Sequence, residues 1–207
     1  MSFEQSVFLF SKGGAMMYPI FIASVITLAI GVERLVVYRR ASKDIMLLWQ
    51  QVKQYLVNNQ PQQALALCEA STNAAAPILY KAASCISKQR SEGIRDAMEG
   101  EAAAQISKLR LRLSYLSTII TLAPLLGLLG TVLGMIKTFN VLSLSSGQPS
   151  IITGGVGEAL IATAAGLCVA IIAALFHSYF SERLEDIITS LEIITNNFLE
   201  VLELINR

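Results

Sequence analysis

Three polar side chains lie inside otherwise apolar stretches of the sequence, where they could handle an ion. Thr131 lies in the stretch 123–136, and Glu158 and Thr163 lie in the stretch 157–167. A carboxylate attracts cations, hydroxyl oxygens can line their path, and a carboxyl group at membrane depth is costly enough to indicate function. The three residues therefore predict the lining of an ion pathway.

Small residues surround these polar side chains in both stretches. Where no hydrophobic effect drives association, small residues let the backbones of two membrane helices approach closely. We therefore expect the two stretches to pack against each other as helices. The predicted packing residues are Pro124, Gly127, Gly130, Gly134, Ala162, Gly166 and Ala170.

Each polar residue also has an ordinary structural interpretation. A threonine in a membrane helix commonly donates to a carbonyl of its own helix one turn back, and an acid in the first turn of a helix is favoured by the helix dipole. Thr131 and Thr163, however, lie at similar depths when counted inward from the segment between the two helices, at about 1.5 Å per residue. A matched polar pair at one level favours a shared path.

Glu158 and Thr163 do not share one face of an ideal helix. They are five residues apart, which is about 140° of rotation. Either the helix start is distorted after Gly154 and Gly155, or Glu158 serves the mouth of the pathway and Thr163 its wall.

The composition indicates an integral membrane protein. Of the 207 residues, 54% are hydrophobic and 15% are charged, and the mean hydropathy is +0.57. Three stretches reach the roughly 20 apolar residues that a transmembrane helix needs. We divide the chain into an outside N-terminus with the first transmembrane helix (1–38), a cytoplasmic helical region (39–115), the second transmembrane helix (116–139), an external connection (140–157), the third transmembrane helix (158–180) and a cytoplasmic tail helix (181–207).

Charge distribution predicts the orientation. Lys and Arg are frequent between the first and second spans and absent from 140–157. By the positive-inside rule the N-terminus and the connection 140–157 lie outside, and the region 39–115 and the C-terminus are cytoplasmic. We expect the first span to be retained, because Glu33 and Arg34 follow Val32 where a signal peptide would have a small-residue cleavage site.

The remaining pattern predicts an all-α fold. Pro61 and Pro77 are placed to open short helices. The second and third spans should extend as long helices into the helical cytoplasmic region, the second with at most a bend near Gly100. An apolar stripe along the tail helix requires packing partners, and its predicted members are Leu184, Ile188, Leu191, Ile194, Phe198, Val201 and Ile205.

Several kinds of site are not indicated. The cysteines Cys68, Cys85 and Cys168 are scattered, so neither a disulfide framework nor a metal site is predicted. No cofactor, nucleic acid partner or enzymatic activity is expected. The charged or titratable residues near span ends are interpreted as side chains at the membrane interface; they are Glu33, Arg34, Lys137 and His177.

Two stretches of the sequence carry a family signature. They are Ala123-Pro124-Leu125-Leu126-Gly127-Leu128-Leu129-Gly130-Thr131-Val132-Leu133-Gly134 and Glu158-Ala159-Leu160-Ile161-Ala162-Thr163-Ala164-Ala165-Gly166-Leu167. Together they strongly resemble the MotA/TolQ/ExbB proton-channel family. Three spans, with the large cytoplasmic part between the first and second, resemble its ExbB and TolQ branch, and ExbB most. The signature is specific over 119–180, and the cytoplasmic helices match only in layout.

The resemblance implies a pore-forming homopentamer whose second and third spans line a central pore. It implies that the pore encloses the helices of two single-span ExbD-like or TolR-like subunits, and that an aspartate of that partner carries the proton. Thr131, Glu158 and Thr163 would occupy matching pore-lining positions. The spans of this chain contain no Asp of their own. The resemblance further implies that the chain is a multi-pass protein of the bacterial inner membrane, with a periplasmic N-terminus and a cytoplasmic C-terminus. It also implies that a TonB-like or TolA-like protein receives the mechanical work.

Two hypotheses of different classes follow. The first is a motor subunit that uses the proton-motive force, with ExbB-like duty in outer-membrane transport or TolQ-like duty in envelope integrity. The second is a passive membrane scaffold, whose glycines and apolar stripes merely assemble helices. A scaffold has no need of Glu158 or of the two threonines.

Overall fold

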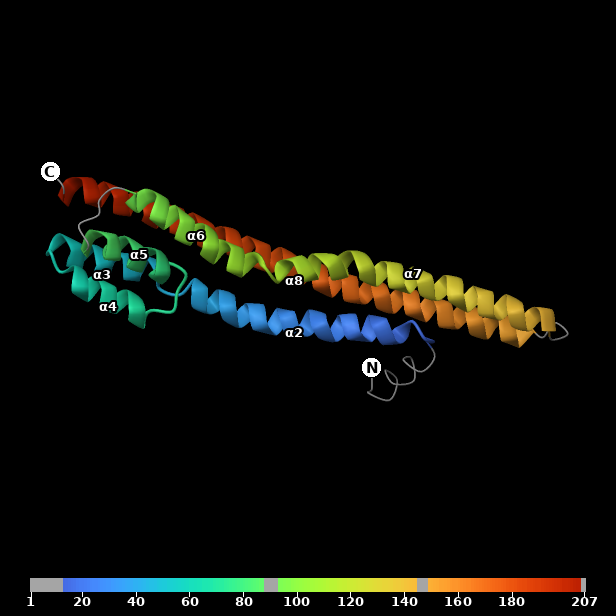
Figure 1. The fold of residues 1–207 in the computed structure, drawn as a ribbon. Helices are drawn as coiled ribbons and strands as arrows, with labels where there is room; N and C mark the ends of the chain where they lie inside the picture. Colours follow the sequence, from blue (N-terminus) through green and yellow to red (C-terminus); the bar gives the residue numbers. More distant parts are fainter. Residues whose placement is uncertain (1–12, 88–92, 145–148, 206–207) are drawn as a thin grey trace. The chain divides into compact units, whose positions relative to one another are not determined.

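The computed structural model describes residues 13–87, 93–144 and 149–205, with side chains described for 13–87, 93–140 and 154–202. The described residues form helices and contain no β-strand (Figure 1). The helices are α2 (Met17–Ala41), α3 (Ile45–Val57), α4 (Pro61–Ala70), α5 (Ala76–Ser87), α6 (Ile94–Arg110), α7 (Leu113–Leu144) and α8 (Pro149–Ile205). This arrangement confirms the predicted all-α fold.

Three helical stretches of the described chain are long and apolar enough to cross a membrane. They include α2, α7 and the first part of α8, which confirms the prediction of three spans. Helical backbone continues further than expected, because α7 reaches Leu144 and α8 begins at Pro149. Much of the predicted connection 140–157 is therefore helical; 145–148 and the N-terminal segment 1–12 lie outside the described residues.

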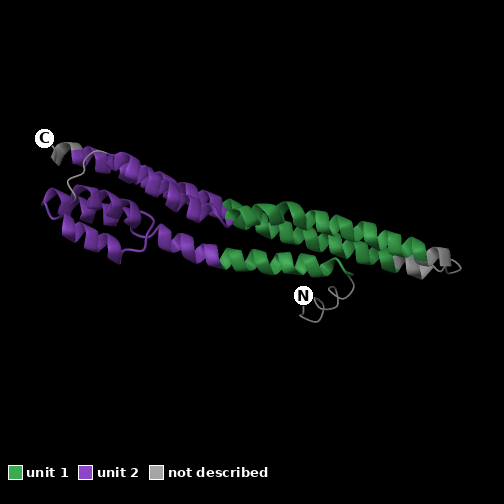
Figure 2. Ribbon diagram, viewed as in Figure 1, with its two compact units in different colours: residues 1–32, 113–178 green, residues 33–112, 179–207 purple. Residues whose placement is uncertain are grey.

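The described chain divides into two compact units (Figure 2). Unit 1 contains the described residues up to Val32 together with Leu113–Ser178, and so holds most of the three apolar stretches. Unit 2 contains Glu33–Arg112 and the described part of Tyr179–Arg207. Unit 1 contains the predicted ion-pathway residues, and unit 2 contains α3 to α6.

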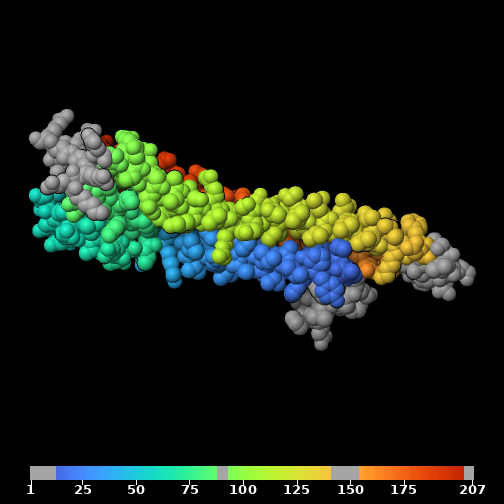
Figure 3. All heavy atoms as spheres, in the orientation of Figure 1, coloured from blue at the N-terminus to red at the C-terminus, as the bar shows by residue number. Residues whose placement is uncertain are grey.

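Helices α3, α4 and α5 form a packed cluster in unit 2, and their atoms gather on the face drawn in Figure 3. Pro61 is the first residue of α4, and Pro77 lies in the first turn of α5, as their fixed φ favours. The Asn73 side chain links the start of α5 to the segment before α3. Its Oδ1 accepts from Ala76 N at 3.0 Å, and its Nδ2 donates to Lys43 O at 3.1 Å.

The last part of α8 supplies the apolar stripe that the sequence predicted. Leu184, Leu191, Ile194 and Phe198 are buried, and the ring centroids of Phe198 and Trp49 are 5.9 Å apart. At the next position of the stripe, Ile187 is fully buried whereas the predicted Ile188 is half-buried. The side chain of Ile205 lies outside the described set.

A two-residue interruption separates α6 from α7. The helices end and begin at Arg110 and Leu113, with turn residues Leu111 and Arg112 between them. Gly100, near which at most a bend was expected, lies within continuous α6. The break therefore falls at Leu111–Arg112, where no glycine or proline marks it.

Two side chains of α2 bind the carbonyl that this interruption frees. Leu109 O accepts a hydrogen bond from Arg34 Nη1 at 3.0 Å and another from Tyr38 Oη at 2.9 Å. A regular helix would have supplied an amide four residues later instead. Arg34 was expected to be a side chain at the membrane interface. The structure adds that this side chain is only 7% exposed and that its guanidinium is bound to protein. Glu33 pairs with Arg112.

Candidate functional site

The predicted glycine face of α7 lies directly against α8 in unit 1. A methyl group added to Gly130 would lie 2.7 Å from Ala162 Cβ, and one added to Gly134 would lie 3.1 Å from Ala159 Cβ. From the other side, a methyl group on Gly166 would collide with Ala123 O. The two backbones are thus in near contact, which only small residues permit.

Two further predicted packing residues, Ala170 and Pro124, belong to the same helix pair. Ala170 is buried on α8. Pro124 lies inside α7 without ending it. Because proline has no amide hydrogen, it removes one bond from the backbone ladder of α7, namely the bond to the carbonyl four residues earlier.

The hydroxyl of Thr163 joins the two helices. Its Oγ1 donates to Gly127 O at 3.0 Å. Gly127 has no side chain to hold this oxygen away, and a methyl group added to it would lie 2.9 Å from Thr163 Cα. The bond therefore depends on the close approach of the helices.

Thr131 has a different partner. Its Oγ1 donates to Leu128 O of its own helix at 2.6 Å, which is the ordinary structural interpretation set out above. The two threonine hydroxyls thus donate to the carbonyls of adjacent α7 residues, Leu128 and Gly127, which places them at similar levels of unit 1. Thr131 is half-buried.

Glu158 forms an ion pair across the same two helices. Its Oε2 is 3.3 Å from Lys137 Nζ, and the two side chains are 26% and 68% exposed. Because α8 is already helical from Pro149, the helix start is not distorted at Gly154 or Gly155. Glu158 and Thr163 have separate partners, Lys137 and Gly127, and the alternative in which Glu158 serves the mouth and Thr163 the wall stays a prediction.

Sequence reasoning missed Lys137 as a partner of Glu158. Both residues lie close to the segment that joins α7 and α8, one on each side of it. Counting depth inward from that segment, as was done for the threonines, would have placed the two charges near each other. The signal was therefore present in the sequence.

The chain leading into α2 passes over the carboxylate of Glu158. A cavity of about 150 Å³ is lined by Gly13, Met16, Gly134, Lys137 and Glu158, among others. Gly14 has φ of 70°, and any side chain there would collide with the Glu158 carboxylate. The positive φ and the missing side chain let the backbone pass over Glu158.

The chemistry of these side chains suits the guidance of a cation. The side chains combine one carboxylate, one ammonium and two hydroxyls. Among the described residues, no group of three His, Cys, Asp or Glu side chains could hold a metal ion. In the apolar stretches of α2, α7 and α8, the acids are Glu33 and Glu158. Neither belongs to a chain of carboxylates that could pass a proton along.

Comparison with known proteins places the chain among ion-channel subunits. The sequence profile of the MotA/TolQ/ExbB proton channel family matches residues 70–193. The ExbB-like 1 biopolymer transport protein of Synechocystis is 36% identical over 173 residues, which are 80% of this chain and 66% of that protein. The biopolymer transport protein exbB1 of Vibrio cholerae is 30% identical over 165 residues, covering 76% of this chain and 71% of that protein.

A relative from the other branch aligns over a shorter region. The Tol-Pal system protein TolQ of Pseudomonas aeruginosa is 37% identical over 98 residues, which are 47% of this chain and 42% of that protein. The family profile covers well over half of the sequence, including the helix pair that carries Thr131, Glu158 and Thr163. The chain therefore belongs to the MotA/TolQ/ExbB proton channel family.

Proposed function

We propose that this chain is an ExbB-like subunit of an inner-membrane motor complex that converts proton-motive force into mechanical work. A homopentamer of the chain would surround two copies of an ExbD-like single-span partner. The work would act on a TonB-like protein that serves active transport across the outer membrane. In this role the chain is a transducer rather than an enzyme.

The observation that carries the proposal is the hydroxyl pair at one level of the α7 and α8 seam. Thr163 reaches Gly127 across the seam, and Thr131 lies one turn along α7. A repeated copy of this pair around a central axis would form a polar ring. The spans contain no Asp, so a titrating aspartate must come from a partner helix facing that ring.

The physical basis of such a motor is electrostatic. A membrane potential supplies about 2.3 kcal/mol per charge per 100 mV. Protonation of the partner aspartate removes the charge that holds it to the polar ring, so the partner can move relative to the ring. Ion flow then produces rotation or a stroke.

The exposed apolar side chains of α7 and α8 support an oligomer in a bilayer. Leu125, Leu128, Leu160 and Leu175 are each more than half exposed in the single chain. A surface of this kind requires lipid or neighbouring copies. We expect the purified chain to be a homopentamer in mild detergent, and a stable monomer would contradict the proposal.

TolQ-like duty is the second candidate, because the relatives include both ExbB and TolQ proteins. Expression of the chain with its single-span partner in cells lacking ExbB, and separately in cells lacking TolQ, separates the two. Restored energy-dependent uptake in the first strain supports ExbB-like duty, whereas restored envelope integrity in the second supports TolQ-like duty. Restoration of neither, with both proteins assembled in the membrane, would refute the motor proposal.

A further inference from the structure

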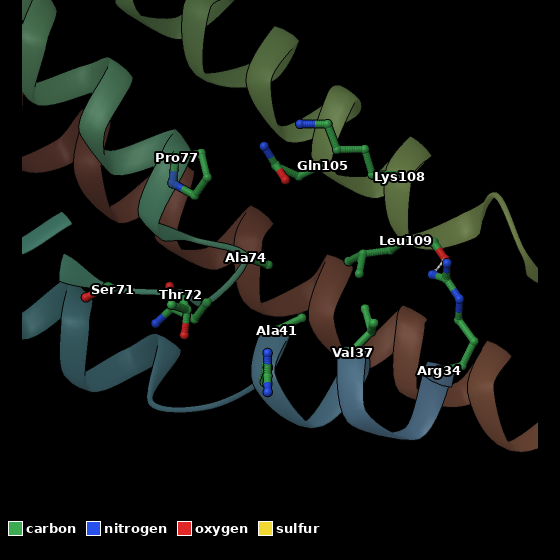
Figure 4. A pocket seen from close by; sticks show the side chains of 12 residues that line it. Arg34, Val37, Ala41, Ser71, Thr72, Ala74, Pro77, Gln105, Lys108 and Leu109 are labelled. Carbon is green, nitrogen blue, oxygen red and sulfur yellow. Dashed lines mark hydrogen bonds between the residues drawn. The ribbon is translucent and has the colours of Figure 1, made fainter. Parts of the chain in front are cut away.

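Unit 2 contains a second, larger cavity that the proposed motor function does not use. It has a volume of about 440 Å³. Figure 4 shows its walls, to which α2, the segment between α4 and α5, and α6 contribute. Leu109 and Arg34, which bind each other at the α6 end, form one side of it.

The charged side chains that line this cavity are all positive. Its lining includes the cations Arg34, Arg40 and Lys108, and none of the described residues that line it is acidic. Arg40 and Lys108 are exposed on their helices, so their ammonium and guanidinium groups can move toward a bound group. Three cations with no acid in the wall attract an anion.

Arg34 adds a buried donor without a partner. Its Nη1 donates to Leu109 O, and its Nη2 lies 3.8 Å from the Glu33 carboxylate, which also pairs with Arg112. Its Nε, in contrast, is buried and has no hydrogen-bond partner among the described residues. A buried donor without an acceptor is costly, so an acceptor brought within reach of it would be stabilised.

The cavity also has an apolar wall next to a candidate span. Val37, Ala41 and Pro77 contribute to the lining. Val37 and Ala41 belong to the last turns of α2, the helix whose earlier residues form an apolar stretch that can cross a membrane. A ligand with both an acyl or glycerol portion and a phosphate fits such a wall better than a free ion does.

We propose that this cavity binds the phosphate of an anionic phospholipid headgroup through Arg34, Arg40 and Lys108. Arginine and lysine are the usual partners of phosphate oxygens, and basic pockets at the ends of membrane helices bind anionic headgroups. Free inorganic phosphate shares this chemistry and is the competing source. The site is independent of the proposed motor role, because binding requires neither a partner subunit nor a proton gradient.

The test uses the full chain, purified in detergent and titrated with phosphatidylglycerol, phosphatidylcholine or inorganic phosphate while native mass spectrometry records bound ligand. The variant is R40Q/K108Q, which removes two exposed lining cations and leaves buried Arg34 in place. The matched control is R39Q/R110Q, which removes the same charge at neighbouring exposed positions outside this cavity. The single variant K108E is a second test should the double variant fail to fold.

The wild type should prefer phosphatidylglycerol to phosphatidylcholine. Two basic contacts of about 1 kcal/mol each correspond to a loss of roughly 30-fold in affinity for R40Q/K108Q, with the control within about threefold of wild type. Equal losses in the variant and the control would show a general charge effect and overturn the site. Binding of inorganic phosphate that depends on Arg40 and Lys108, without binding of phosphatidylglycerol, would refute the proposal that the bound phosphate belongs to a lipid.

Discussion

Thr163 Oγ1 donates a hydrogen bond of 3.0 Å to Gly127 O, across the line where α7 and α8 meet. Thr131, one turn away on α7, donates within its own helix instead. The two threonines share a level but differ in what their loss would do to the helix pair. Substitution by valine, which keeps the shape and removes the hydroxyl, separates ion conduction from helix packing.

Thr131→Val should leave the α7 and α8 contact intact, because its bond lies within one helix. We expect normal assembly but reduced proton-driven uptake, since the polar ring loses one hydroxyl per copy. Thr163→Val should reduce uptake and also lower stability modestly, by about 0.6 kcal/mol for a bond between membrane helices. Uptake in cells and thermal aggregation in detergent measure the two effects. Unchanged uptake in both variants would show that the two threonines do not belong to the ion pathway.

The glycine at 166 should not tolerate even one methyl group. In Gly166→Ala the new carbon would collide with Ala123 O and lie 3.2 Å from Gly127 Cα, so the helices must separate. We expect a destabilisation of about 1–3 kcal/mol, seen as earlier thermal aggregation and loss of oligomer. Gly157→Ala on the same helix is the control, because a methyl group there meets nothing within 4 Å. Equal behaviour of the two variants would contradict the close contact.

The Glu158 and Lys137 pair permits a charge test at the mouth of the pathway. If Glu158 attracts cations, Glu158→Gln should impair proton-driven function while expression and assembly stay near normal, and Glu158→Asp should be milder. Lys137→Gln should then raise or preserve activity, because it removes a competing cation 3.3 Å away. Proton flux into vesicles measures both. If Lys137→Gln instead gives the same defect as Glu158→Gln, proton flux requires the ion pair and not the carboxylate alone.

The interruption between α6 and α7 should depend on the side chains that bind Leu109 O. Tyr38→Phe removes one of its two hydrogen bonds, at a cost of about 0.5–1.5 kcal/mol, and leaves the Arg34 bond. We expect faster hydrogen exchange in peptides around 107–114, measured by mass spectrometry. Tyr115→Phe, at an exposed position in the first turn of α7, serves as the control and should leave exchange unchanged.

The cysteines should differ sharply in reactivity. Cys68 is only 3% exposed, and burial raises the pKa of its thiol to about 12. Because the thiolate is the reactive form, Cys68 should resist maleimide in the folded protein and react only after unfolding. The raised pKa also means that stability falls as pH rises above about 9, where the unfolded thiol ionises first. Rapid labelling of Cys68 in the native chain would show that it is not buried.

This burial changes how orientation is tested. Cys68 and Cys85 belong to the region 39–115, which the positive-inside rule places in the cytoplasm, so impermeant reagents should reach them only from the inside. Cys68 is buried, so the half-buried Cys85 is the suitable native probe. We expect Cys85 to label only from the cytoplasmic side, and labelling only from outside would reverse the proposed topology.

The features that follow from local pattern could be predicted from the sequence. Apolar length predicts the spans, and the regular spacing of small residues predicts the seam between α7 and α8. The site residues could be placed in depth but not given partners, because partners depend on how one helix is rotated against the other. That rotation sends Thr163 to Gly127 and leaves Thr131 with Leu128.

The break at Leu111–Arg112 shows what local pattern misses. The residues around it are compatible with a helix and include no proline or glycine, so nothing local predicts an end. The alternative partner for Leu109 O comes from Arg34 and Tyr38, more than 70 residues away. An interaction so distant in sequence leaves no periodic signal.

The contrast between this interruption and the unbroken α8 has a mechanical consequence. A helix of 57 residues, about 85 Å long at 1.5 Å per residue, resists twisting through one continuous hydrogen-bond ladder. The path from α6 to α7 has a gap in that ladder, held by two side-chain hydrogen bonds to a single carbonyl. Under an applied torque, α8 should therefore twist less than the α6–α7 path, in which the twist should concentrate at Leu111 and Arg112.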